Sequence, residues 1–199
     1  MEIKTGLVIA HLIGLALGVG GATLMDLILV RFVVRGNIAR EHADILHLSS
    51  YLVSGGLLLL WVSGIAFLTH YYLFNQAALA NPKVLAKIAI VGVLTVNGFL
   101  IHKHVLPIIE RNVGRRLFDG VSVRQKAWML AAGAVSATSW YVPLALGARR
   151  EFNFVVPASQ ILTVYVALLL TAILSAQVVG RLFTEKNQLA RQRLRRARA

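Results

Sequence analysis

The chain has 199 residues, of which 57% are hydrophobic and only 15% are charged, and its mean hydropathy is +0.70. A soluble globular domain contains about 45–50% apolar and about 25% charged residues, so this composition excludes an ordinary soluble domain. The absence of cysteine excludes disulfides, thiolate metal sites and thiol catalysis. The formal charge of +13 would suit nucleic acid, but the basic residues lie in loops and a tail beside hydrophobic segments. This pattern is typical of membrane topology, and we expect no nucleic acid to bind.

The apolar residues gather in five long segments, each longer than the roughly 20 residues that cross a bilayer as a helix. Their short connections should make consecutive helices antiparallel neighbours. We therefore predict an all-α polytopic membrane protein, with five transmembrane helices in one domain, residues 1–184, and a basic cytoplasmic tail, residues 185–199. The predicted spans are 6–34, 44–73, 83–109, 124–147 and 159–184.

The distribution of basic residues predicts how the bundle is oriented. With the N-terminus outside, sixteen of the 21 Lys and Arg residues fall on the cytoplasmic side. The five that remain outside are Lys4, Lys83, Lys87, Arg149 and Arg150. Because short cytoplasmic loops carry an excess of Lys and Arg, the sequence favours an outside N-terminus and a cytoplasmic C-terminus.

The first span carries a stripe of polar and small residues. At about 100° per residue, one face of this helix presents His11, Gly14, Gly18, Ala22 and Asp26. Small residues let a neighbouring backbone approach closely, so we expect this stripe to face into the bundle. An acid inside a membrane helix costs about 2.5–3.5 kcal/mol on insertion scales, so other groups in the bundle must offset the cost of Asp26.

Polar residues of the third span extend the candidate site. Lys87 lies in its outer half, where a side chain that reaches toward the headgroups is favoured over a buried one. Asn97 and His102 follow toward the inner end, and Pro107 is expected to end the regular helix. Counted along the helix axes, Asp26 should be nearly level with Asn97.

His47 of the second span should lie nearly level with His102, about one turn below Asp26. Facing histidines on neighbouring helices can hold haem or a metal ion, with Asp26 hydrogen-bonded to one of these ligands or acting as a proton carrier. The metal-ligand candidates are His11, His47 and His102, Asn97 joins them as a cofactor-binding candidate, and Asp26 and Lys87 are the catalytic candidates. In the alternative interpretation, the histidines only mark the membrane interface, and Asp26 is hydrogen-bonded to Asn97 or to a serine.

Two segments resemble a known family. NPKVLAKIAIVGVLTVNGFLIHKHVLPII is similar to a helix of bacterial copper-resistance protein D and related domains, with matching positions at Lys87, Asn97 and Pro107. HLIGLALGVGGATLMDLILVRF resembles the opening helix of that superfamily, and the resemblance covers roughly residues 6–110. The superfamily includes small haem-associated protoporphyrinogen oxidases of the bacterial membrane. The resemblance implies that His11 ligates haem and that Lys87 matters for function.

The sequence thus predicts a membrane protein that binds haem b or copper between its helices and has a redox or ion-handling role. If it is an enzyme, it should be a membrane oxidoreductase. The alternative is a non-catalytic membrane subunit or a small permease, whose buried polar residues only fix helix packing. We expect it in the bacterial inner membrane, with anionic lipids at the basic tail, and with copies of itself or other membrane proteins as further candidate partners.

Overall fold

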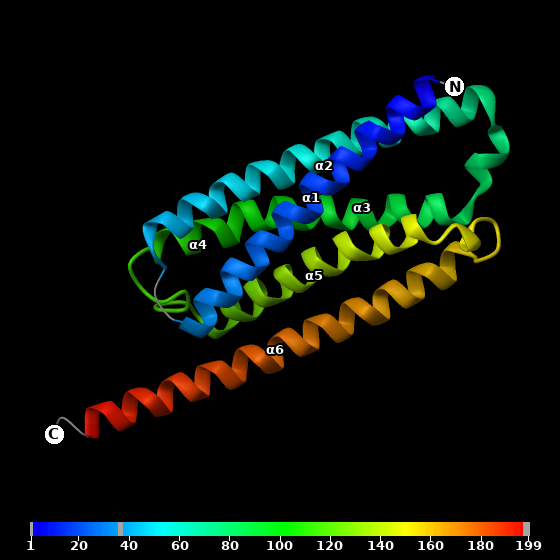
Figure 1. Cartoon of the computed structure of the whole chain (residues 1–199). Coiled ribbons are helices and arrows are strands. Elements are labelled where there is room, and N and C mark those ends of the chain that lie inside the picture. The colour runs from blue at the N-terminus through cyan, green and yellow to red at the C-terminus, as the bar shows by residue number, and fades with distance from the viewer. Residues whose placement is uncertain (1, 36–37, 197–199) are drawn as a thin grey trace.

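The computed structural model describes residues 2–35 and 38–196, nearly all of which are helical (Figure 1). The helices are α1 (Glu2–Arg35), α2 (Arg40–Phe74), α3 (Pro82–Leu100), α4 (Leu106–Arg111), α5 (Val123–Ala148) and α6 (Ala158–Arg196). Short helical turns occur at η1 (Gln76–Ala80), η2 (Ile101–Val105) and η3 (Arg150–Phe152). These ranges contain no β-strand beyond one isolated bridge between Ile38 and Val113.

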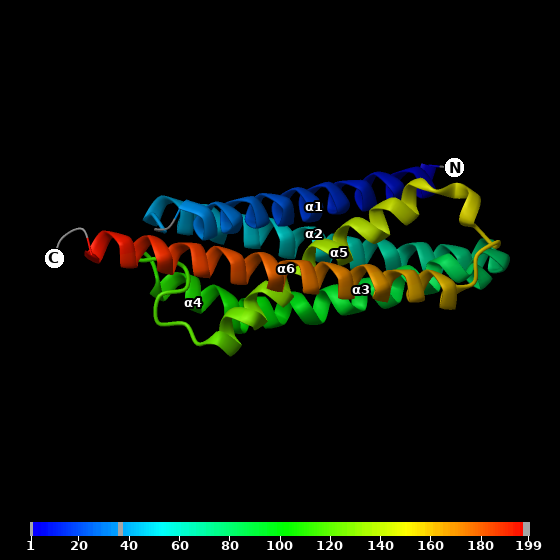
Figure 2. The ribbon, with the colours of Figure 1, turned by 90° about the horizontal axis from the view of Figure 1, so that it is seen from below.

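Five segments of the described chain are long and apolar enough to cross a membrane. They are Ile3–Val33, Arg40–Phe74, Pro82–Arg111, Val123–Ala148 and Ala158–Leu182. The predicted all-α bundle of five helices is therefore confirmed, and the protein is a multi-pass membrane protein. The predicted tail is helical as far as Arg196, because α6 continues past the end of the bundle without a break (Figures 1 and 2). Its last residues, 197–199, lie outside the described part.

The inward stripe predicted for α1 is confirmed where α1 crosses α2. Gly14 and Gly18 lie against Gly56 of α2, so that the two backbones are in direct contact. The indole ring of Trp140 from α5 covers Gly18 and is only 2% exposed. A Cβ atom at Gly14 would lie 3.0 Å from the carbonyl oxygen of Gly56, and one at Gly18 would overlap the ring of Trp140, so the close packing favours glycine at both positions.

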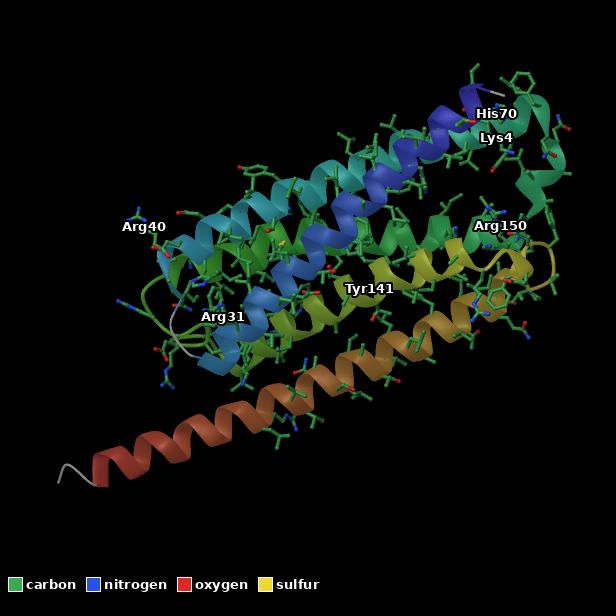
Figure 3. The ribbon with its side chains drawn as sticks, in the orientation of Figure 1. Lys4, Arg31, Arg40, His70, Tyr141 and Arg150 are labelled. Carbon is green, nitrogen blue, oxygen red and sulfur yellow. The ribbon has the colours of Figure 1, made fainter. Side chains whose placement is uncertain are left out.

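Helix α5 holds the bundle together. It runs obliquely to the other helices and packs against α1, α3 and α6 (Figure 2). Midway along the bundle, the hydroxyl groups of Tyr141 on α5 and Thr23 on α1 are hydrogen-bonded at 2.8 Å (Figure 3). Ser122 caps the start of α5 through a reciprocal pair of hydrogen bonds with Gln125.

The third span differs from the expectation at Pro107. Regular α-helix ends at Leu100, and η2 is a π-turn in which the backbone N–H of Leu106 donates to the carbonyl of Ile101. The helix then resumes through Pro107 and ends at Arg111, so the prediction that Pro107 ends it is wrong. Proline has no N–H, and its ring clashes with the carbonyl four residues earlier, but a wider turn just before it avoids both problems.

The two ends of the bundle differ in charge. Arg31 and Arg40 lie at one end, which we call the basic end (Figure 3). The third span and the start of α5 add further basic residues there, Lys103, Arg111 and Arg124. Lys4, His70 and Arg150 lie at the other, which we call the N-terminal end (Figure 3). The positive-inside rule predicts that the basic end faces the cytoplasm.

Candidate functional site

Asp26 lies beside a cavity of about 70 Å³ between α1, α2, the third span and α5. The carboxylate is half-buried, and no hydrogen bond or ion pair from the described residues reaches it. Most of the wall is apolar, and it includes Leu57 and Leu94. The polar residues of the wall are Asp26, Ser50, His102, Ser136 and Trp140. A cavity that holds one water needs about 10–15 Å³, so this one has room for several.

The predicted contact between Asp26 and Asn97 is wrong. Asn97 is buried, and its side-chain amide donates to the backbone carbonyl of Ala132 on α5 at 3.0 Å. It lines a different cavity, between α3 and α5. Helical rise predicted that Asp26 and Asn97 lie at the same depth in the membrane. Asn97, however, faces α5 rather than α1.

His102 lines the same cavity as Asp26. Its Nε2 is 3.2 Å from the hydroxyl of Ser54 on α2, a hydrogen bond whose direction depends on the tautomer. His102 lies in the π-turn η2, where the helical register shifts by one residue. The turn thus brings a titratable imidazole into the wall of the cavity next to Asp26.

His47 and His102 line one cavity of about 200 Å³, so the structure brings the two residues near each other. They do not bind each other. Nε2 of His47 is 2.8 Å from Oε1 of Glu110 on α4, and both side chains are about half-exposed. The residues that the structure describes contain no group of three His, Cys, Asp or Glu side chains placed to hold a metal ion.

A series of adjoining cavities connects Asp26 with the basic end. The Asp26 cavity and the His47 cavity share Ser50, His102 and Leu106 in their walls. The His47 cavity in turn shares His47 and Glu110 with a third cavity, of about 350 Å³. This third cavity reaches the exposed start of α2, where Arg40 and Asp44 line it.

Toward the N-terminal end, the helices pack tightly next to the cavity. Gly18 and Gly56 bring α1 and α2 into backbone contact there, and Trp140 fills the space against α5. The indole Nε1 of Trp140 is buried and has no hydrogen-bond partner among the described residues. The series of adjoining cavities therefore extends from Asp26 toward the basic end. On the other side of Asp26, toward the N-terminal end, the helices are closely packed at Gly18 and Trp140.

His11 lies apart from His47 and His102, at the depth of Ser63 on α2. Its Nδ1 is 2.8 Å from the hydroxyl of Ser63, and its ring meets the ring of Phe67 edge-on at 5.7 Å. Lys87 of α3 is close enough to interact electrostatically with His11, and its ammonium group lies against Gly147 of α5. Lys87 is half-buried, so it extends into the bundle more than the sequence favoured.

Sequence reasoning missed Glu110, Ser63 and Trp140. Glu110 is one of only two acids, with Asp119, in the strongly basic segment 103–126, and this is a signal that could have identified it as a partner for histidine. Ser63 and Trp140 gave no comparable signal, because serine and tryptophan are common in membrane helices.

Comparison of the chain with protein-family models, with curated proteins and with solved structures finds no match.

Proposed function

We propose that this protein handles protons within the membrane, with Asp26 as the group that takes up and releases them. Protons would reach Asp26 from the basic end, by way of the His47–Glu110 pair and then His102. The observation that carries this proposal is the series of adjoining cavities, with a titratable side chain in each wall that two of them share. We place this activity in the bacterial inner membrane, with the basic end toward the cytoplasm.

The chemistry of the cavity suits a proton better than a larger cation. Calcium takes about six to eight oxygen ligands and magnesium about six, whereas the wall offers one carboxylate, two hydroxyls and one imidazole. A proton needs one carboxylate oxygen, and water in the cavity can relay it to His102. An unpaired ionisable residue at membrane depth marks ion and proton pathways in other membrane proteins.

Modification of Asp26 by dicyclohexylcarbodiimide in sealed vesicles tests the proposal, because this reagent attacks protonated carboxyl groups in apolar surroundings. The pH is set separately on the two sides, and the orientation is scored by tryptic removal of the basic tail. The tryptic peptide from Thr5 to Arg31 contains Asp26 as its only acid, so mass spectrometry reads its modification alone. We expect the modification to follow the pH at the basic end and to disappear in Asp26→Asn.

Glu41→Gln is the matched control, because Glu41 is exposed in the first turn of α2 and lines none of the three cavities of the route. This variant should retain the modification of Asp26 with the same dependence on pH. Modification that follows the pH at the N-terminal end, or that responds to neither side, would overturn the proposal. In that case the alternative holds, in which Asp26 is a structural polar group of a non-catalytic subunit.

The surroundings of His11 favour a second candidate function, haem binding with a redox role. Nδ1 of His11 is held by Ser63, while Nε2 has no partner among the described residues. A histidine held through one ring nitrogen and open at the other suits a haem ligand, and Lys87, whose charge acts on His11, would pair with a carboxylate group of the cofactor. Haem would supply one-electron chemistry, and copper is the other cofactor that the resemblance implies.

The absorption spectrum of the detergent-purified protein, with metal analysis alongside, tests this second candidate. We expect a Soret band that is lost in His11→Ala. His70→Ala is the control, because His70 lies on α2 at the same end but packs against Tyr71 and Phe74. Absence of the band after addition of haem, together with absence of stoichiometric copper, would contradict cofactor binding.

A further inference from the structure

A second polar cavity, of about 450 Å³, lies at the basic end between the third span and the start of α5. Its charged and titratable wall residues are Lys103, His104, Arg111 and Arg124, and no acid lines it. Helix α5 starts beside it at Val123 and has no acid in its first turn. The positive end of the α5 dipole therefore adds to the charge of the basic side chains.

The basic side chains of this cavity are available to a ligand. Within the described chain, no carboxylate forms an ion pair with Lys103, Arg111 or Arg124. The ammonium group of Lys103 lies 5.8 Å from the ring centre of Phe99. A cavity with three unpaired cations and the N-terminus of a helix attracts an anion such as phosphate.

An apolar groove adjoins this cavity. It measures about 560 Å³, runs between α3 and α5, and shares Trp128 with the wall of the basic cavity. Its apolar wall residues are mainly Gly92, Val93, Val96, Leu100, Ala131 and Val135. Along α3, the groove extends from Leu100 to Gly92, which corresponds to about 12 Å at helical rise and so to much of one acyl chain.

Trp128 marks the boundary between the two regions. The residue is 45% exposed, and the centre of its ring lies 6.3 Å from that of His104. Tryptophan favours the membrane–water interface, where one part of the ring is apolar and another is polar. The basic cavity thus lies at headgroup depth, and the groove continues from it into the hydrocarbon region.

We propose that these two regions form one binding site for an anionic phospholipid. The phosphate group binds among Lys103, Arg111 and Arg124, and one acyl chain lies in the groove beside Trp128. The charged and titratable residues of this site differ from those of the Asp26 cavity, with His104 here and His102 there, although Val105 and Met129 contribute to both walls. Basic pockets between membrane helices at the cytoplasmic side bind anionic headgroups in other membrane proteins, and the charge complementarity here is of the same kind.

Native mass spectrometry of the delipidated protein tests the site, with phosphatidylglycerol, phosphatidylcholine or inorganic phosphate added at equal concentrations. We expect one phosphatidylglycerol to be retained, with phosphatidylcholine and inorganic phosphate bound far more weakly. Each basic residue near the headgroup contributes about 1 kcal/mol, so the double variant Arg111→Gln/Arg124→Gln should bind phosphatidylglycerol about 30-fold more weakly. Val96→Trp should also weaken binding, because a large ring fills the groove without changing any charge.

Two controls match these variants. Arg31→Gln/Arg115→Gln removes two exposed charges at the same end, outside the basic cavity, and should leave binding unchanged. Val62→Trp places the same ring on an exposed position of α2. Equal retention of phosphatidylcholine, equally strong binding of inorganic phosphate, or equal losses in the control variants would each overturn the proposal.

Discussion

Replacing Gly56 with valine is expected to separate α1 from α2 and to lower the stability of the whole bundle. A Cβ atom at residue 56 would lie 2.6 Å from the backbone nitrogen of Gly18, 2.7 Å from the carbonyl oxygen of Gly14 and 2.9 Å from the Cα atom of Gly18. All three are backbone atoms, so no rotation of a side chain can relieve the clash. Overpacking a core typically costs about 1–3 kcal/mol, and a rigid backbone contact belongs at the upper end of that range.

The measurement is thermal unfolding of the detergent-purified protein, followed by circular dichroism. Gly55→Val is the matched control, since a Cβ atom at residue 55 meets no atom within 4 Å. Both variants place the same β-branched residue in the same turn of α2, so they carry the same cost in helix propensity. The prediction requires the melting temperature of the Gly56 variant to lie well below that of the Gly55 variant. Equal melting temperatures would show that the helices do not cross in this way.

Most of the fold could be predicted from the sequence because bilayer thickness fixes the length of a membrane span. The start and end of each apolar segment therefore predicted the membrane-spanning segments to within a few residues, as for the fourth span, predicted as 124–147 and observed as Val123–Ala148. Helix α6 itself continues beyond its span to Arg196. Small residues also identified the face of α1 that packs inward, at Gly14 and Gly18. The π-turn could not be predicted, because proline is compatible with either a helix end or a widened turn.

The candidate site could be predicted less completely, because helical rise gives the depth of a residue but not its direction around the bundle. Depth alone placed His47 and His102 correctly beside one cavity. The same reasoning failed for Asn97, which is turned toward α5 and bonded to the carbonyl of Ala132. Direction depends on which helices are neighbours, and short loops constrain only consecutive ones. The contacts of α5 with α1 and α3 lie beyond that information.

The predicted histidine pair acquires a different role in our proposal. Haem or a metal ion held between His47 and His102 stays a prediction, whereas the hydrogen bonds in the structure join each of them to another side chain. Imidazoles bonded to a carboxylate and to a hydroxyl suit stepwise proton transfer, because each can accept a proton on one nitrogen and release one from the other. This assigns the two residues of the predicted metal site to successive positions on one proton route.

Replacing His102 with leucine is expected to slow the exchange of protons between Asp26 and the basic end by about 10²-fold or more, since positioned acid–base groups contribute about 10²–10⁴-fold. Within the described chain, His102 is the titratable side chain that lines both the Asp26 cavity and the His47 cavity. Leucine keeps the volume of the side chain but cannot carry a proton. The measurement is stopped-flow infrared spectroscopy after a pH jump at the basic end, which follows the carboxyl band that Asp26→Asn removes.

His104→Leu is the matched control, because His104 lies in the same π-turn but lines the basic cavity on the other side. This variant should exchange protons with Asp26 at the wild-type rate. If both variants slow the exchange equally, the effect comes from disturbing the turn, and if neither does, the route does not pass through His102. The two histidines are two residues apart on a helical turn and so point in opposite directions. A difference between their variants would therefore assign one side of the third span to proton exchange, independently of the lipid site proposed on the other.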